Sequence, residues 1–303
     1  MQKLFNFANM PQFPLRGLGN VQQLRTFLEK KRLDGVELIL WDDSIDNTAF
    51  KREIVGVHLK YWPSWLPIYE GRRQNNAGIS FEDWLEQIKT NVRAALRLEP
   101  EYLVWHVADC TVPECFSFQF KRSNMDVLRA TAELVPEIFA EVPPQVKILF
   151  ENLWWPGLTL LDNRETEWFF DSLALPNAGL VLDTGHLLNT DYTATTEQEC
   201  IRVLLQRVRA MGELRQLIKG MHLNLSISAA YRRSCWGQIK TGYTQDELGY
   251  HIAKIDQHRG FTDPSLAELL ELIKPEYVNN ELLFNTKEEL SLLLDKQLLA
   301  ADI

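Results

Sequence analysis

The chain has 303 residues, of which 46% are hydrophobic and 24% are charged, and its formal net charge is −9. This composition is typical of a globular protein with ample apolar material for a core, and the uninterrupted apolar runs are too short to span a bilayer. The acidic balance argues against duplex nucleic acid as a partner, because broad contact with a phosphate backbone depends on clustered Lys and Arg. We therefore expect a small-molecule substrate and no membrane partner.

Two further features bear on the compartment. The first residues contain neither a continuous apolar stretch nor a small-residue cleavage pattern, so they do not resemble a secretory signal, and we expect a cytoplasmic protein. Cys110, Cys115, Cys200 and Cys235 lack the paired spacing of a zinc ribbon, and in a reducing compartment they are expected to be free thiols. The sequence does not fix the oligomeric state, and a monomer is favoured.

Short β-branched or aromatic runs alternate with helical patterns along the whole chain, which predicts consecutive βα units. Strands are predicted at residues 3–7, 35–40, 54–59, 102–107, 146–152, 179–182, 218–223 and 276–283. Helices are predicted where apolar positions recur every three to four residues, at 21–31, 81–98, 125–142, 165–174, 197–217, 264–273 and 287–299. Ser80 and Asn163 are expected to cap two of these helices, and Pro264 to open a third. Because no linker interrupts the alternation, one domain over residues 1–303 is the economical prediction.

Histidines and carboxylates gather at the ends of these strands or in the loops that follow them. They are His58, His106, Glu151, Asp183, His186, His222, Asp256, His258 and Glu281. Imidazole and carboxylate are ligand types that suit zinc, manganese or iron. Burying an acid after an apolar strand is costly without a partner, and a metal ion would supply one. The set therefore predicts a polynuclear site for divalent metal ions.

This placement also selects the fold. Eight strands that alternate with helices form either a closed (β/α)₈ TIM barrel or an open doubly wound sheet. In a barrel the carboxyl ends of all strands meet at one mouth, whereas an open sheet gathers residues mainly at its switch point. Ligands supplied by six or more strands therefore favour an α/β single (β/α)₈ TIM barrel with its active site at the C-terminal mouth.

The same segments resemble the endonuclease IV branch, also called AP endonuclease family 2, of the xylose isomerase-like TIM barrels. The likeness lies in residues 58–61, 105–106, 150–152, 183–186, 222–226 and 256–260 and in Glu281, and it runs from about the third strand to the eighth. It implies three ions, held by His58, His106 and Glu151; by Glu151, Asp183, His222 and Glu281; and by His186, Asp256 and His258. It also implies that Glu37 anchors a hydrogen bond at the mouth.

The chemistry that such a site suits is hydrolysis of a phosphoester, because divalent ions activate water and neutralise phosphate charge. Glu151 and Glu281 are the candidate catalytic carboxylates. The alternative is a sugar or inositol isomerase or epimerase with one ion held by the second of the three groups, in which Glu151 and Glu281 transfer the proton. That alternative leaves the other five ligand-type residues unexplained. A third hypothesis, a non-catalytic ligand-binding barrel, is disfavoured by the intact ligand set.

Three departures from the family pattern bear on the substrate. The chain is acidic, an enlarged loop is expected at about residues 224–255, and aromatic residues flank the predicted mouth. The candidate substrate contacts are Tyr61, Trp62, Trp154, Asn224 and Arg259. The aromatic rings either stack on a substrate or pack loops onto the rim, and the enlarged loop either covers the mouth or is inert. Together these features favour a compact phosphorylated or sugar-like substrate over duplex DNA. His251 is expected to be structural or to line the rim.

Overall fold

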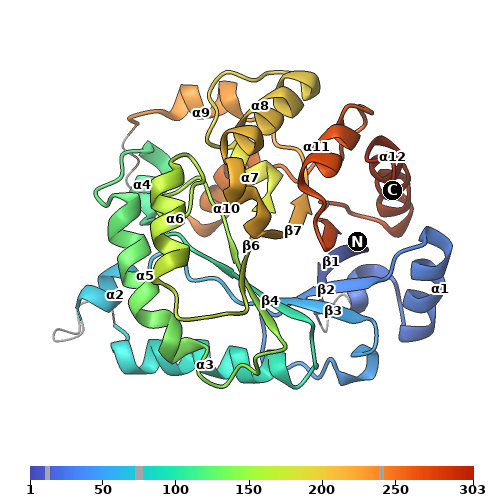
Figure 1. The fold of residues 1–303 in the computed structure, drawn as a ribbon, viewed down its shortest axis with the longest axis horizontal. Helices are drawn as coiled ribbons and strands as arrows, with labels where there is room; N and C mark the ends of the chain where they lie inside the picture. Colours follow the sequence, from blue (N-terminus) through green and yellow to red (C-terminus); the bar gives the residue numbers. More distant parts are fainter. Residues whose placement is uncertain (11–13, 72–77, 239, 241) are drawn as a thin grey trace.

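Parallel strands form a closed barrel in the computed structural model, which describes residues 1–10, 14–71, 78–238, 240 and 242–303. Each strand pairs with the next along the chain, and the last pairs with the first. Figure 1 shows the strands with helices around them. The strands are β1 (Gln2–Ala8), β2 (Gly35–Ile39), β3 (Ile54–His58), β4 (Tyr102–His106), β5 (Lys147–Glu151), β6 (Ala178–Asp183), β7 (Ile218–Leu223) and β8 (Tyr277–Asn280). This confirms the predicted (β/α)₈ TIM barrel.

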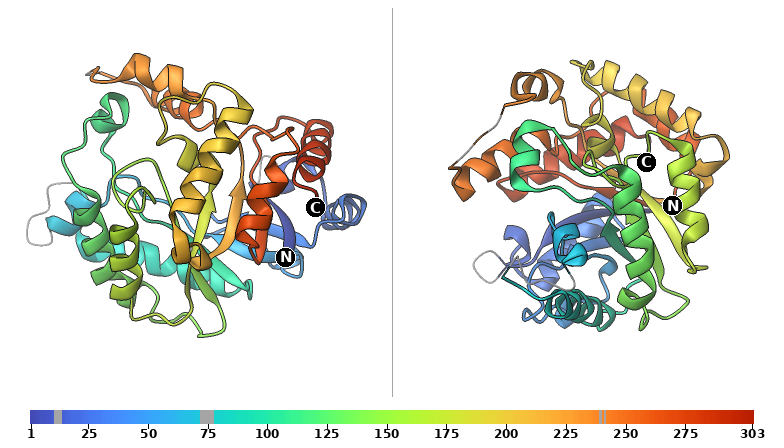
Figure 2. Two further views of the ribbon diagram at one scale, coloured as in Figure 1. Left: turned by 45° about the horizontal axis from the view of Figure 1, so that its top comes forward. Right: turned by 90° about the vertical axis from the view of Figure 1, so that its left-hand side faces the viewer.

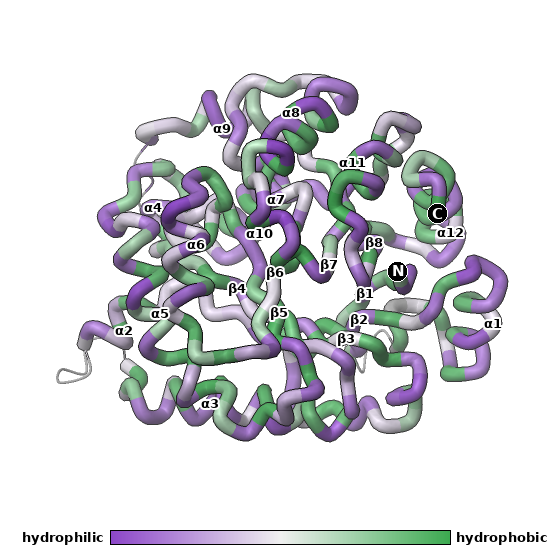
Figure 3. Tube along the Cα trace, in the orientation of Figure 1, coloured by the Kyte–Doolittle hydropathy of each residue, from purple (hydrophilic) through white to green (hydrophobic). Residues whose placement is uncertain are grey.

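The helices surround the strands on the outside (Figure 2). The longer ones are α1 (Val21–Lys31), α3 (Phe81–Leu96), α5 (Asn124–Ile138), α6 (Asn163–Ser172), α8 (Glu197–Ala210), α11 (Leu266–Ile273) and α12 (Lys287–Ala300). Hydrophobic and hydrophilic colours alternate along α3 and α5 (Figure 3), as expected for helices that bury one face. The main apolar core lies between these helices and the barrel, and a smaller one fills the barrel interior. No helix in the described part of the chain is long and apolar enough to cross a membrane.

Most helix positions agree with the sequence prediction, but several boundaries need correction. Helix α5, predicted to run to residue 142, ends at Ile138, and β8, predicted at 276–283, ends at Asn280. Ser80 caps α3 as predicted, because its hydroxyl accepts from the Asp83 backbone N–H at 3.0 Å. The cap of α6 is Asp162 rather than Asn163. Pro264 lies in the turn before α11, which begins after Ser265. The helix predicted at 197–217 ends at Ala210, and a 3₁₀ helix, η3 (Gly212–Leu217), follows it.

Further helices lie in the connections that follow the strands: α2 (Leu66–Glu70), α4 (Val112–Ser117), α7 (Thr184–Leu188), α9 (Ala229–Cys235) and α10 (Gln245–Ile255), with the 3₁₀ helices η1 (Pro14–Gly17) and η2 (Thr48–Phe50). The segment expected as an enlarged loop therefore carries two helices, although residues 239 and 241 lie outside the described residues. A capping box between Thr244 and Glu247 starts α10. Both helices pack on α4 in an apolar cluster that also contains Trp154 and Trp155.

Candidate metal centre

The nine predicted ligands all lie at the C-terminal mouth of the barrel. His58, His106, Glu151 and Asp183 are the last residues of four successive strands, β3 to β6. The remaining five are His186 on α7, His222 near the end of β7, Asp256 at the end of α10, His258 in the loop after it, and Glu281 directly after β8. The structure brings them together in three groups, and within each group the ligand atoms lie within 4.8 Å of one another. These are the same three groups that the resemblance implies.

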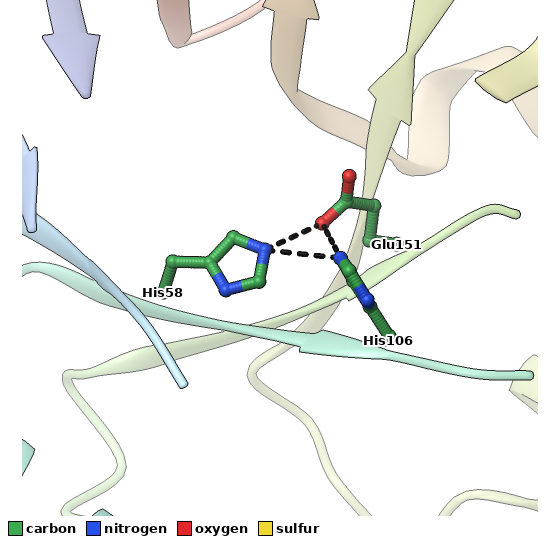
Figure 4. A group of neighbouring side chains, drawn as sticks. All are labelled: His58, His106 and Glu151. Atoms are coloured by element: carbon green, nitrogen blue, oxygen red, sulfur yellow. Dashed lines mark hydrogen bonds and ion pairs between the residues drawn. The ribbon is translucent and has the colours of Figure 1, made fainter. Parts of the chain in front are cut away.

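The first group consists of His58, His106 and Glu151 (Figure 4). The two Nε2 atoms lie 3.0 Å apart, and Glu151 Oε2 lies 3.0 Å from His58 Nε2 and 2.9 Å from His106 Nε2. Ligand atoms ~2.1 Å from a tetrahedral zinc ion lie about 3.4 Å apart. Three acceptor-type atoms at this spacing therefore fit around one small cation.

Glu151 links the first group to the second. While Oε2 faces His58 and His106, its other oxygen, Oε1, lies 3.1 Å from His222 Nδ1. His222 Nδ1 is also 3.0 Å from Glu281 Oε2 and 3.9 Å from Asp183 Oδ2. Glu151 is fully buried, and each of its two oxygens faces a different group of candidate ligands. This is the geometry of a carboxylate that bridges two metal ions.

The third group adjoins the second through Glu151 as well. Asp256 Oδ2 lies 2.7 Å from His258 Nε2 and 3.4 Å from His186 Nε2, and His186 Nδ1 lies 3.3 Å from Glu151 Oε1. His258 adopts the left-handed conformation, with φ of 45°. A non-glycine residue in this region carries strain of order 1 kcal/mol, which the surrounding structure must offset.

Four of the five histidine rings are held in place by a hydrogen bond from the ring nitrogen that does not face the other members of the group. The partners are Leu59 O for His58 Nδ1 at 2.9 Å, Asn152 O for His186 Nδ1 at 2.9 Å, Glu281 O for His258 Nδ1 at 3.2 Å, and the Glu37 carboxylate for His222 Nε2 at 3.1 Å. Each of these acceptors requires an N–H, so in the neutral ring the other nitrogen presents a lone pair to the group. His106 differs, because its Nδ1 is buried without a partner among the described residues.

Glu37 on β2 supports the centre from inside the barrel. Its carboxylate is fully buried and accepts from three donors: the Tyr102 hydroxyl at 2.8 Å, His222 Nε2 at 3.1 Å and Asn279 Nδ2 at 3.0 Å. Glu37 therefore anchors a hydrogen bond at the mouth, as the resemblance implies. Tyr102 and Asn279 were not anticipated, because neither stands beside a ligand in the sequence.

Asp183 is fixed by buried amides on two sides. Asn224 Nδ2 donates to Asp183 Oδ2 at 2.8 Å, and the Asn152 side chain accepts from the Asp183 backbone N–H at 2.9 Å. Both asparagines are fully buried. Asn224, predicted as a substrate contact, thus lies behind a ligand rather than on the surface of the mouth.

Comparisons with known proteins identify the fold. No protein-family model matches the chain, and no curated protein sequence matches it. Solved structures do match. The 3-keto-D-glucoside 4-epimerase YcjR from E. coli aligns over 100% of both chains with 12% identity and a TM-score of 0.54. Endonuclease IV from Thermus thermophilus aligns over 97% of both chains with 16% identity and a TM-score of 0.52. The IolI protein, solved with a bound zinc atom, aligns over 100% of this chain and 95% of its own with 16% identity and a TM-score of 0.54.

This chain therefore shares its TIM-barrel fold with these proteins. The similar structures include both an endonuclease and sugar epimerases. At such low identity the likeness concerns the fold, so the chemistry has to be argued from the residues at the mouth.

Aromatic residues flank two of the three groups at the mouth of the barrel. The Tyr61 ring lies 4.5 Å from the His106 ring, and the Trp154 ring lies 5.1 Å from the His186 ring. Trp62 instead packs against the main apolar core, with Lys60 Nζ 5.2 Å from its ring. Arg259 is exposed, and its backbone pairs with Leu225 in an isolated bridge. Of the predicted substrate contacts, Tyr61 and Trp154 are therefore the two whose rings adjoin the candidate ligands.

The nine candidate ligands place several ionisable side chains close together, and burial makes their charged forms unfavourable. Burial raises the pKa of Asp183 to about 7. Burial by itself lowers the pKa of His258, but the adjoining Asp256 carboxylate outweighs it and raises this pKa to about 10. A cluster of carboxylates and imidazoles held this closely requires neutralisation by protons or by cations. Divalent ions can take the place of protons at such sites, so the donor set fits metal ions.

Proposed function

We propose that the protein is a metal-dependent hydrolase of phosphoesters that acts on a compact substrate with up to three divalent ions, zinc foremost. The observation that carries the proposal is the position of Glu151. Its two oxygens face the first and second groups of candidate ligands, and His186 of the third group lies beside it. When bound, such ions would supply an activated water and neutralise charge on the phosphate and the departing oxygen.

The chain's own residues fix where this chemistry would occur. Both oxygens of Glu151 lie within 3.3 Å of imidazole nitrogens of the candidate ligand groups. As a ligand shared between ions, Glu151 would position the attacking water rather than act as a free base. Glu37 keeps Nε2 of His222 occupied and leaves Nδ1 for the centre. Tyr61 and Trp154 form apolar walls beside the first and third groups, which would exclude water around a bound substrate.

Two features support a compact substrate. The net charge of −9 disfavours a long polyanion. Helices α9 and α10 pack on α4, in the same apolar cluster as Trp154 and Trp155, and so enlarge the wall of the mouth near the third group. A small phosphorylated ligand, recognised by the ions and by aromatic side chains, suits these features better than duplex DNA.

One observation favours a second candidate, a sugar isomerase or epimerase. The second group by itself contains one histidine and three carboxylates, a complete set for one ion. Glu151 and Glu281 both lie within 3.1 Å of His222 Nδ1, so proton transfer next to a carbonyl could run between them. This candidate gives no role to the first and third groups apart from Glu151, and for that reason we rank it second.

Metal content distinguishes the two candidates. The protein is loaded with zinc, passed through a desalting column, and analysed for zinc per chain, alongside Asp256→Ala and His258→Ala. The hydrolase proposal predicts about three ions in the unaltered protein and about two in each variant. Lys254→Ala, an exposed position in the last turn of α10, just before Asp256, is the matched control. One ion per chain, unchanged in both variants, would contradict the trinuclear centre.

Reaction assays then address the chemistry. The zinc-loaded protein is incubated with a panel of small phosphodiesters and phosphomonoesters and, separately, with free ketoses. Release of phosphate or alcohol that disappears in Asp256→Ala is the expected result. Epimerisation of a ketose without ester cleavage would decide for the second candidate.

A further inference from the structure

Arg232 on α9 is a buried arginine with an unusual set of partners. Its side chain is fully buried, its guanidinium lies 4.3 Å from the Tyr192 ring centroid, and its Nη2 donates to the backbone oxygens of Leu188 and Asp191. Burying a guanidinium is costly, and carbonyl oxygens compensate only part of that cost. Packing of α9 alone does not require a cation at this position, since an apolar residue of similar volume could fill it.

A series of hydrogen bonds connects Arg232 to Asp256, a member of the third group of candidate ligands. Arg232 Nε lies 3.0 Å from Ser228 Oγ, Ser228 Oγ lies 2.7 Å from Asn189 Oδ1, and Asn189 Nδ2 lies 3.4 Å from Asp256 Oδ1. Ser228 and Asn189 are 2% and 1% exposed, so water does not compete for these contacts. The three residues connect α9, the end of α7 and the end of α10.

The two ends of this hydrogen-bond series agree on its direction. The Arg232 guanidinium has only donors, so Ser228 Oγ accepts from Arg232 and keeps its own hydrogen available for Asn189 Oδ1. At the other end, the Asp256 carboxylate has only acceptors, so the NH₂ group of Asn189 donates to it. Arg232 and Asp256 therefore both favour the same orientation of the Asn189 amide.

We propose that Arg232, Ser228 and Asn189 form a relay that positions Asp256 as a single-oxygen metal ligand. The relay occupies Oδ1 of Asp256, while Oδ2 faces His186 and His258. The inference rests on the proposed function, because it assigns a role to the third metal group. Residues that hold a ligand by hydrogen bonds typically change metal affinity by about 10–100-fold when they are removed.

Ser228→Ala is the sharpest test, because it removes one hydroxyl and leaves the buried arginine in place. Zinc-loaded protein is titrated with a chelator, and the release of each ion is followed separately. We expect one of the three ions to bind about 10–100-fold more weakly, and the other two to bind as in the unaltered protein. Ser228→Thr keeps the hydroxyl and should restore tight binding.

Two further variants separate positioning from packing. Arg233→Gln is the matched control, because Arg233 stands on the same helix, is exposed, and donates to the Tyr192 carbonyl; its zinc release should match that of the unaltered protein. In an Asp256→Ala background, Ser228→Ala should weaken no further ion, because its target is gone.

The possible results distinguish failure of the relay hypothesis from failure of the trinuclear hypothesis. Equal affinity for all three ions in Ser228→Ala and the unaltered protein would overturn the relay. A uniform weakening of all three ions, or failure of Ser228→Thr to restore binding, would mean that Ser228 acts only through packing, and would overturn it too. Fewer than three ions in the unaltered protein would overturn the trinuclear proposal and the relay together.

Discussion

Replacement of Glu37 by glutamine tests whether the barrel interior prepares His222 for metal. The carboxylate accepts from Tyr102, His222 and Asn279 at 2.8, 3.1 and 3.0 Å. Glu37→Gln keeps the shape of the side chain but turns one acceptor into a donor. Because three donors surround this position and glutamine offers one acceptor oxygen, at least one donor must face the new NH₂ group.

The size of the effect follows from the contacts that are lost. A buried hydrogen bond to a charged group contributes about 1.5–3 kcal/mol, and a buried donor left without a partner adds a penalty of similar size. We expect a loss of about 3 kcal/mol in the free energy of unfolding. With an unfolding entropy of ~2.1 cal/mol/K per residue, a chain of this length would lose about 5 °C in its midpoint. If His222 is released, zinc at the second group should bind about 10–100-fold more weakly.

The assay combines thermal unfolding of the zinc-free protein with chelator titration of the loaded protein. Tyr102→Phe is the matched control, because it removes one donor and leaves the bond between Glu37 and His222 intact. We expect Tyr102→Phe to change stability but not zinc affinity. If Glu37→Gln binds zinc as tightly as the unaltered protein, the argument that Glu37 orients His222 is wrong.

Three other substitutions have clear expected outcomes in thermal unfolding. In Gly185→Ala the new Cβ would lie 1.8 Å from Asn224 Oδ1, so we expect a loss of about 2–3 kcal/mol. Gly249→Ala, within α10, meets nothing within 4 Å and should gain about 0.5–1 kcal/mol; equal midpoints for these two variants would contradict the packing argument. Tyr61→Phe removes a buried hydroxyl that has no partner among the described residues, so a gain of up to about 1 kcal/mol is expected, and a clear loss would show that the hydroxyl is bonded.

The gathering of the strand-end candidate ligands could be predicted because it depends on strand order alone, whereas their division into three groups came from the family resemblance. Once eight strands are placed in sequence, their carboxyl ends meet at one mouth, so Glu151, Asp183 and Glu281 must lie near one another whatever the loops do. The residues that orient the ligands follow a different logic. The resemblance implied a hydrogen bond of Glu37 at the mouth but not its partner, His222 on β7, because a contact across the barrel leaves no trace in sequence spacing.

The helices of the 224–255 segment show the opposite case, in which a readable signal was missed. Thr244 and Glu247 form a capping box directly before the apolar positions of α10, a start signal of the same kind as the one read correctly at Ser80. The relay could not have been foreseen in this way. Asn189 and Arg232 are 43 positions apart in the chain, and they meet only because α9 packs beside the end of α7.

The 224–255 segment is connected to the candidate metal centre at two points, which argues against an inert insertion. Asp256 is both the C-terminal cap of α10, with its backbone N–H donating to Ile252 O at 2.8 Å, and a member of the third donor group. Any shift of α10 along its axis therefore moves a ligand atom. On the other side, α9 reaches the same carboxylate through Ser228 and Asn189. Helix α9 thus begins, and α10 ends, at residues connected to one candidate ligand. We therefore expect the third ion to depend on this segment more than the other two ions do.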